Sequence, residues 1–140
     1  KFLLDTNVVS ETMRASPNRH LLRALARHDG QLGISVVTWH ELAFGVRRLP
    51  KGARRTALEV RLRDLAGDLP APVPFTGEAA DWLASERARL EAKGVSISIE
   101  DGVIAATASL ANLTVVTANT KDFVPFLALR VVDWSRPSER

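Results

Sequence analysis

The chain has 140 residues, of which 46% are hydrophobic and 25% are charged, so it is long enough to bury a substantial core within one domain. No apolar run approaches the roughly 20 residues that a bilayer crossing requires, and Asp5 interrupts the first apolar run too early for a signal peptide. The lack of cysteine excludes disulfides and thiolate metal sites and suits a cytoplasmic protein. We therefore predict a single domain over residues 1–140, with a cytoplasmic location and no membrane partner.

The first third of the chain predicts two strands and two helices. Residues 2–4 are apolar without alternation, which indicates a strand buried on both faces. One helix is predicted from Val8 to Met13, and a second over residues 17–30, where leucines recur at helical spacing. Residues 32–36 predict the second strand.

The middle of the chain is predicted to be mainly helical. Residues 39–46 mark a helix that stops by Pro50, and residues 56–69 carry leucines on one helical face. Three prolines then leave residues 73–75 as a short strand or an extended link. Over residues 76–94 a threonine N-cap and a terminal glycine frame a long helix.

Short strands and helices alternate in the last third. Residues 95–99 are predicted to be extended, and residues 103–110 to form a helix of small side chains. A strand is predicted at residues 114–117, a short helix at 122–127 and the last strand at 129–132. Strands separated by helices predict an α/β fold with a parallel sheet covered on both faces.

The net charge of +3 is distributed unevenly along the chain. Most of the excess lies between Arg47 and Arg63, where Glu59 is the one acidic residue. An isolated basic run is usually the solvated face of a helix. A basic stripe beside a separate acidic set, however, is typical of proteins that process nucleic acids, because phosphates are attracted to one and react at the other.

Four carboxylates follow predicted strands or begin the next helix. Asp5 ends the first strand, Glu41 lies about one helical turn beyond the second, Asp101 begins the small-residue helix, and Asp122 follows residues 114–117. In an open parallel sheet, groups at the carboxyl ends of the strands gather at one edge, where the strand order reverses. These four acids can therefore meet in one site.

Carboxylates that are brought together repel one another unless a cation lies between them. Ligands that are all oxygen suit Mg²⁺ or Mn²⁺, whereas Zn²⁺ usually takes histidine or cysteine. Such an ion activates water and neutralises charge on a phosphate, so the acids favour metal-assisted phosphodiester hydrolysis. Small polar residues beside the acids are candidate supporting groups, although a local backbone bond is an equal alternative for the two threonines. They are Thr6, Asn7, Thr117 and Asn119.

Each acid also has an ordinary structural interpretation. Asp5 could be an N-cap, and residues 38–41, 98–101 and 119–122 each fit or nearly fit a capping box. From spacing alone, the capping and metal-site interpretations stay about equally open. The histidines lack metal-ligand spacing and are predicted to be solvated or packed.

The helix from Trp39 to Leu49 carries more apolar residues than one buried face needs. It predicts either a groove for a partner segment or ordinary burial against the sheet, and the sequence does not choose between them.

Four segments resemble the VapC-type toxins of the PIN-domain family, and the resemblance runs along the whole chain. An acid follows the first strand, Glu-Leu lies on the helix after the second, and D-x-x-I-A-A-T-A and T-x-N-x-x-D-F come in that order. The resemblance implies a PIN-like three-layer α/β/α sandwich with a central, mainly parallel sheet of four to five strands. The segments are LLDTNVVSE (3–11), VVTWHELAFGV (36–46), EDGVIAATASLANLTVVTANTKDF (100–123) and LRVVDW (129–134).

The resemblance also implies residue roles. Asp5, Glu41 and Asp101 match the three core ligands of a Mg²⁺ or Mn²⁺ site. The fourth acidic position of the wider family falls at Asn119, and Asp122 takes that role instead.

Members of this group are metal-dependent endoribonucleases that act as toxins of type II toxin–antitoxin pairs. The resemblance therefore implies an RNA substrate, a homodimer and silencing by a cognate VapB-type antitoxin. Basic residues near the site would position the RNA backbone rather than distinguish bases. They are Arg47, Arg48, Arg54 and Arg55.

Three other interpretations were compared with the sequence, and it counts against the first two. A halo-acid-dehalogenase phosphatase requires D-x-D, but residue 7 is Asn. A receiver domain needs an adjacent acid pair that the first strand lacks. A catalytically silent PIN fold, serving as an RNA- or protein-binding module, is favoured by Asn119, and metal-dependent RNA cleavage that is lost in Asp5→Asn would separate enzyme from module.

Overall fold

The computed structural model describes residues 1–137, and residues 138–140, the end of the predicted domain, lie outside the described residues. Its four strands form one parallel sheet in the order β2-β1-β3-β4. The strands are β1 (Phe2–Leu4), β2 (Leu32–Gly33), β3 (Thr114–Val116) and β4 (Val131–Val132). The α-helices are α1 (Thr6–Thr12), α2 (Arg19–Arg27), α3 (Val36–Arg47), α4 (Ala53–Asp68), α5 (Gly77–Ala92) and α6 (Ile99–Leu110), and one 3₁₀ turn, η1 (Thr120–Asp122), follows β3.

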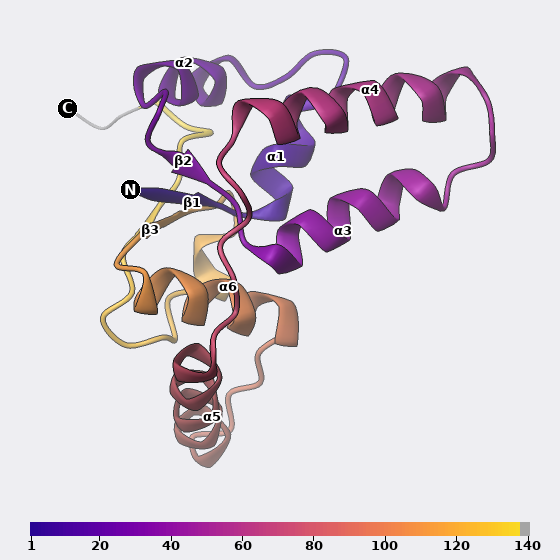
Figure 1. Cartoon of the computed structure of the whole chain (residues 1–140). Helices are drawn as coiled ribbons and strands as arrows, with labels where there is room; N and C mark the ends of the chain where they lie inside the picture. The colour runs from indigo at the N-terminus through magenta and orange to yellow at the C-terminus, as the bar shows by residue number, and fades with distance from the viewer. Residues whose placement is uncertain (138–140) are drawn as a thin grey trace.

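Helices cover both faces of the sheet, which confirms the predicted α/β/α layering (Figure 1). Alternate residues of the central strands point to opposite faces. Leu4 and Val116 pack with apolar side chains of α1 to α4, while Leu3 and Val115 pack with those of α5 and α6. The apolar strands are therefore buried on both sides, as their lack of alternation predicted.

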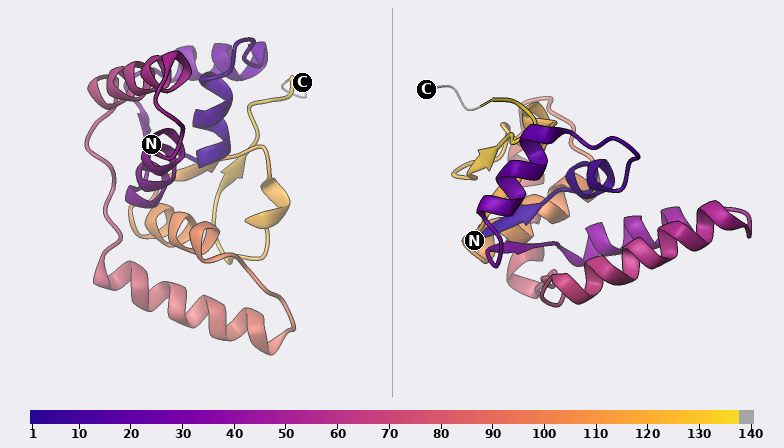
Figure 2. Two further views of the ribbon diagram at one scale, coloured as in Figure 1. Left: turned by 90° about the vertical axis from the view of Figure 1, so that its right-hand side faces the viewer. Right: turned by 90° about the horizontal axis from the view of Figure 1, so that it is seen from above.

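The helices α3 and α4 lie side by side and project beyond the sheet as an arm (Figure 2). On the opposite face, α5 packs against α6 and lies outermost (Figure 1). Thr76 caps α5 as predicted, since its Oγ1 accepts a hydrogen bond from the Ala79 amide at 3.1 Å. Among residues 1–137, no helix combines the length and apolar character that crossing a bilayer would require.

The second strand is shorter than predicted because a helix begins inside the predicted range. Ser35 is the N-cap of α3, so Val36 is already helical. The backbone of Ile34 accepts a hydrogen bond from Val73 at 2.8 Å, and Val36 donates one to the Val73 carbonyl at 3.0 Å. The proline-rich link thus supplies the pairing that a longer strand would have made.

Two predicted boundaries near the C-terminus are also wrong. The predicted helix over residues 122–127 is a 3₁₀ turn followed by irregular backbone. Phe123 and Phe126 are both buried in the core. Pro125 between them has no backbone N–H and cannot donate the hydrogen bond that the interior of a helix requires. In addition, α6 begins at Ile99, before the predicted start, because Ser98 caps it.

Candidate active site

The strand order reverses between β1 and β3. After β1 the chain adds β2 on one side, and later adds β3 and β4 on the other. A crevice is expected outside the carboxyl ends of strands at such a point. Asp5 directly follows β1, and the segment carrying Asn119 and Asp122 follows β3, so sheet topology brings these residues to one edge.

Asp5 is buried, with 6% of its surface exposed, and both of its oxygens accept hydrogen bonds. Oδ1 accepts from the Thr6 amide at 2.7 Å, so Asp5 is indeed the N-cap of α1. Oδ2 accepts from Asn7 Nδ2 at 2.9 Å and from Thr117 Oγ1 at 2.8 Å. The cap interpretation is therefore confirmed for this residue, and Asn7 and Thr117 fix the orientation of its carboxylate at the candidate site.

Glu41 lies in the second turn of α3 and contacts the same network. Thr6 Oγ1 donates to Glu41 Oε1 at 3.3 Å and lies 3.2 Å from Thr38 Oγ1. The Thr38 amide donates to Ser35 Oγ at 3.1 Å, so Ser35 is the N-cap of α3. The alternative in which Thr38 and Glu41 form a capping box is wrong, because the N-cap is Ser35.

Sequence reasoning assigned no role to Ser35 and considered Thr38 only as a helix cap, although both side chains are fully buried beside the candidate site. Ser35 Oγ lies 3.3 Å from Thr38 Oγ1, which continues the chain of hydroxyls to Thr6. The usable signal was the S-x-x-T spacing before the acid, which marks an N-cap one turn ahead of Glu41.

Asp101 and Asp122 complete the acidic edge from two further elements. Asp101 is half-buried in the first turn of α6, where the helix N-terminus favours negative charge. Asp122 is exposed at the end of η1, and its amide donates to the Asn119 carbonyl at 3.0 Å. The Asn119 amide donates to Thr117 Oγ1 at 3.0 Å, which ties this turn to the group that holds Asp5.

Burial raises the pKa of the carboxyl groups of Asp5, Glu41 and Asp101, and the loss of solvation is the largest cause for each. Neighbouring carboxylates act in the same direction. Asp122 raises the pKa of both Asp5 and Asp101, and Asp5 raises the pKa of Glu41 and Asp101. Glu100 contributes to the same effect at Glu41 and Asp101, so the edge carries five interacting acids.

The donor chemistry of this edge fits a hard divalent cation. The buried and half-buried candidate ligands are all carboxylates, and at each of them at least one neighbouring carboxylate adds to the rise in pKa, an effect that a shared cation would reverse. Among residues 1–137, no three acidic or histidine side chains are yet grouped as closely as a metal site requires.

Glu41→Gln is expected to raise the melting temperature of the metal-free protein by about 2–4 °C at neutral pH. The pKa of Glu41 is raised on folding, so its stabilising contribution is complete below the unfolded pKa and is lost as pH rises through the folded value. The neutral amide avoids that loss, and its carbonyl can still accept from Thr6. Thermal melts of both proteins in a chelator, from acidic to neutral pH, measure this effect. The melting temperatures of Glu41→Gln and the parent should become equal below about pH 4.

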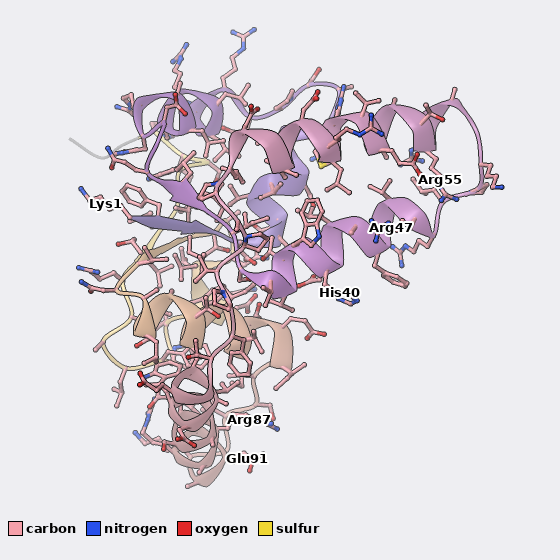
Figure 3. All side chains as sticks on the ribbon, in the orientation of Figure 1. Lys1, His40, Arg47, Arg55, Arg87 and Glu91 are labelled. Atoms are coloured by element: carbon pink, nitrogen blue, oxygen red, sulfur yellow. The ribbon has the colours of Figure 1, made fainter. Side chains whose placement is uncertain are left out.

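Glu91→Gln, at an exposed position on α5, is the matched control for this measurement (Figure 3). A difference between Glu41→Gln and the parent that is the same at every pH would contradict the electrostatic explanation.

The four predicted RNA contacts lie on the arm formed by α3 and α4, and Figure 3 shows Arg47 and Arg55 near its outer end. Arg55 is already engaged, since its Nε donates to Glu59 at 2.8 Å and its guanidinium also donates to the Leu49 carbonyl at 3.3 Å. The others have exposed side chains and form no salt bridge within residues 1–137. They are Arg47, Arg48 and Arg54.

The PIN-domain family model matches residues 2–124, and the chain belongs to this family. It is 37% identical over 127 residues to the VapC ribonuclease Y4jK of Sinorhizobium fredii, a match that covers 86% of this chain and 89% of that protein. It is 30% identical over 138 residues to the tRNA(fMet)-specific endonuclease VapC of Salmonella typhimurium, with 96% and 98% covered. These relatives confirm the predicted resemblance to VapC-type toxins.

Solved structures support the same assignment. The crystal structure of FitAcB from Neisseria gonorrhoeae has a TM-score of 0.79 and 34% identity, with 94% of this chain and 96% of that chain covered. DNA-bound VapBC from Salmonella typhimurium has a TM-score of 0.84 and 27% identity, with 96% and 98% covered. The fold of this chain is thus the PIN-domain fold found in the FitAcB and VapBC structures.

Proposed function

We propose that the chain is a divalent-metal-dependent endoribonuclease that acts in the cytoplasm as the toxin of a type II toxin–antitoxin pair. The observation that supports the chemistry is a set of electrostatically coupled carboxylates at the point where the strand order reverses. The relatives named as ribonucleases support the RNA substrate. The all-oxygen donor set supports Mg²⁺ or Mn²⁺ as the cofactor.

In this proposal Asp5, Glu41 and Asp101 hold the cation, and Asp122 orients the attacking water. A bound divalent ion supplies Lewis acidity toward the phosphate and lowers the pKa of a water molecule. The protein provides fixed geometry, because Asn7 and Thr117 hold Asp5 through its Oδ2.

Hydrolysis forms a bond between the water oxygen and phosphorus and breaks the bond from phosphorus to the 3′ oxygen, which takes up a proton. The products are a 5′-phosphate and a 3′-hydroxyl. Asn119, whose side chain forms no hydrogen bond at the start of η1, is available to donate to the phosphate. Exposed arginines of the arm position the RNA backbone, with Arg47 about six residues, or roughly 9 Å of helix, beyond Glu41.

The proposal is tested by incubating RNA with the protein with and without Mg²⁺ or Mn²⁺ and sequencing the 5′-phosphate ends. Metal-dependent cleavage at defined bonds supports the enzyme. RNA binding without cleavage under any divalent ion would favour the alternative, a catalytically silent RNA- or protein-binding module, for which Asn119 is the supporting residue.

A groove of about 680 Å³ between α1, α3 and α4 supports the antitoxin part of the proposal. Its lining includes Thr6 and Glu41 of the candidate site and Arg54 and Arg61 of α4. Arg61 donates to the Met13 carbonyl across the groove. An extended segment with acidic and apolar side chains would match the arginines, and an arginine at its tip would neutralise the acidic edge and block the site.

Gly45→Trp is expected to weaken binding of the antitoxin at least tenfold while the fold is kept. Gly45 lines the groove, and a Cβ placed there meets no atom within 4 Å, so a side chain would occupy the groove rather than the core. Replacing a helical glycine should also slightly stabilise α3. Co-purification with the product of the neighbouring small gene measures the effect.

Gly67→Trp is the control, because Gly67 lies on an exposed part of α4 and its Cβ position is equally open. Retention of the partner by both variants would place the antitoxin elsewhere.

The homodimer is proposed to form through the exposed apolar side chains near the acidic edge. Phe44 on α3 is 56% exposed and Ile99 at the start of α6 is 50% exposed. The two helices that carry these side chains contact each other. A Phe44→Asp variant that remains dimeric in sedimentation experiments would exclude this surface.

A further inference from the structure

A second cavity, outside the acidic edge, lies between α2 and the segment after β4. Its volume is about 670 Å³. In Figure 1 α2 lies beside the C-terminal segment, away from the arm of α3 and α4. The charged and aromatic residues that line this cavity, called here the α2 cavity, are His20, Arg23, Arg27, Asp133, Trp134 and Arg136.

The α2 cavity is positively charged. Three arginines against one aspartate give a formal charge of +2 with histidine counted as neutral. Asp133 is engaged locally, since its Oδ1 accepts from the Ser135 amide and hydroxyl at 2.8 and 2.6 Å and its Oδ2 lies 3.6 Å from Arg136 Nε. Arg23 and Arg27 are exposed and form no salt bridge within residues 1–137, so their charge is available to a ligand.

The two free arginines lie on the same side of α2. They are four residues apart, which places them about 6 Å apart along the helix axis on neighbouring turns. The helix sequence RHLLRALAR contains no acid that could neutralise them. Guanidinium groups in such a row donate several hydrogen bonds in a fixed geometry that matches phosphate oxygens.

An ordered aromatic wall adjoins these arginines. The Trp134 ring is stacked on His28 with centroids 4.8 Å apart and meets the edge of Phe2 at 4.8 Å. Phe2 belongs to β1, so the wall is attached to the central strand of the sheet. Cationic grooves with aromatic side chains are typical of sites that follow a single-stranded nucleic acid.

A smaller cavity of about 230 Å³ adjoins the α2 cavity on the side of the candidate active site. Asp133 and Trp134 line both cavities. At its other end the smaller cavity is lined by Asn7 and Ala118, which are joined by a hydrogen bond of 3.3 Å from the Ala118 amide to Asn7 Oδ1. Asn7 also donates to Asp5 at 2.9 Å, so the smaller cavity lies between a residue that holds Asp5 and the Asp133–Trp134 wall of the α2 cavity.

We propose that the α2 cavity is a second RNA-binding site, which holds the phosphate backbone of the strand that extends from the site of cleavage. The proposal rests on the proposed function, because it takes the substrate to be RNA. This site is separate from the arginines of the arm, which lie on α4 and at the end of α3. Arg23 and Arg27 are assigned a role in binding RNA and no part in the reaction.

The test measures binding of a fluorescein-labelled single-stranded poly(U) RNA of about 20 nucleotides, in a chelator that prevents cleavage, as a function of salt. The double variant Arg23→Gln/Arg27→Gln removes two phosphate contacts. Its plot of log affinity against log salt should be shallower by about 1.4, since each contact on a single strand contributes about 0.7. Between roughly 50 and 200 mM salt, the unmodified protein then loses about sevenfold more affinity than the variant.

The control is Arg87→Gln/Lys93→Gln, which makes the same change in net charge at exposed positions on and just after α5 (Figure 3 labels Arg87). Equal slopes for the two double variants would overturn the proposal, because a general charge effect would then explain the result. An unchanged slope with Arg23→Gln/Arg27→Gln would overturn it as well, and would leave an acidic protein partner as the ligand to test.

The two proposals fail in different ways. If the α2 cavity does not bind RNA, the RNA affinity of Arg23→Gln/Arg27→Gln depends on salt as that of the unmodified protein does. Metal-dependent cleavage can still occur in that case. If the nuclease proposal is wrong, no cleavage occurs with any divalent ion, whatever the double variant does to binding.

Discussion

Asp5→Asn is expected to reduce metal-dependent RNA cleavage by roughly 10²–10³-fold or more, the range typical for loss of one preorganised electrostatic group. Asp5 is the most buried of the site acids and the one that topology places at the strand-order reversal. Asparagine remains a good N-cap for α1, so the fold should persist. Cleavage of an end-labelled RNA in Mg²⁺ or Mn²⁺, with a thermal melt of each sample, measures both effects.

Asp81→Asn, at an exposed position on α5, is the matched control and should cleave like the parent. Asp122→Asn and Asn119→Ala then compare the two candidates for the fourth position. We expect the loss to be about 10–100-fold for Asp122→Asn and smaller for Asn119→Ala. Full activity of Asp5→Asn in a folded protein would refute the metal-site proposal.

Glu86→Ala is expected to destabilise the protein by about 2–4 kcal/mol, because several hydrogen bonds depend on this one side chain. Glu86 is 7% exposed on α5. It accepts from Arg89 at 3.0 and 2.9 Å and from the Leu127 amide at 3.1 Å, while Arg89 also donates to the Pro125 carbonyl at 2.8 Å. The pair therefore attaches the irregular loop after η1 to α5. Denaturant unfolding measures the loss.

The pH dependence of this pair gives a second measurement. The hydrogen bond from Arg89 lowers the pKa of Glu86, so its stabilising contribution is present above the unfolded pKa and is lost as pH falls through the folded value. The cost of Glu86→Ala should thus be largest near neutral pH and shrink in acid. Glu78→Ala, at an exposed position in the first turn of α5, is the control. A loss for Glu86→Ala that is independent of pH would indicate packing alone.

Loop attachment also matters for the site, because Asp122 lies one residue before the buried Phe123. Trp82 of α5 packs against Phe126 with centroids 5.8 Å apart, which adds an apolar contact to the polar one. A helix on the outer layer thereby holds the turn that carries Asp122, a candidate active-site acid. Glu86→Ala is consequently expected to disturb the position of Asp122 more than that of Asp5, because hydrogen bonds from Asn7 and Thr117 fix Asp5.

The sequence by itself determined the local features of the fold. The non-alternating run at residues 2–4 and the small residues of α6 predicted a sheet buried on both faces, since these patterns act through the nearest neighbours along the chain. Thr76 and Gly94 marked the ends of the long helix correctly, because capping involves only a few adjacent residues. The positions of the four acids after strands were also evident.

Contacts distant in sequence decided the rest. Val36 begins a helix rather than ending a strand because Val73 forms hydrogen bonds with the backbone of Ile34 and Val36, on either side of Ser35. No pattern in the neighbouring sequence indicates that Val73 is the partner. Glu41 is linked to Asp5 through Thr6, whose hydroxyl donates to Glu41 and whose amide donates to Asp5, and this link depends on how α1 and α3 pack. The α2 cavity with Arg23 and Arg27 arises because the segment after β4 returns beside α2. Side chains separated by tens of residues meet only after the sheet forms, so their joint chemistry is a property of the tertiary structure.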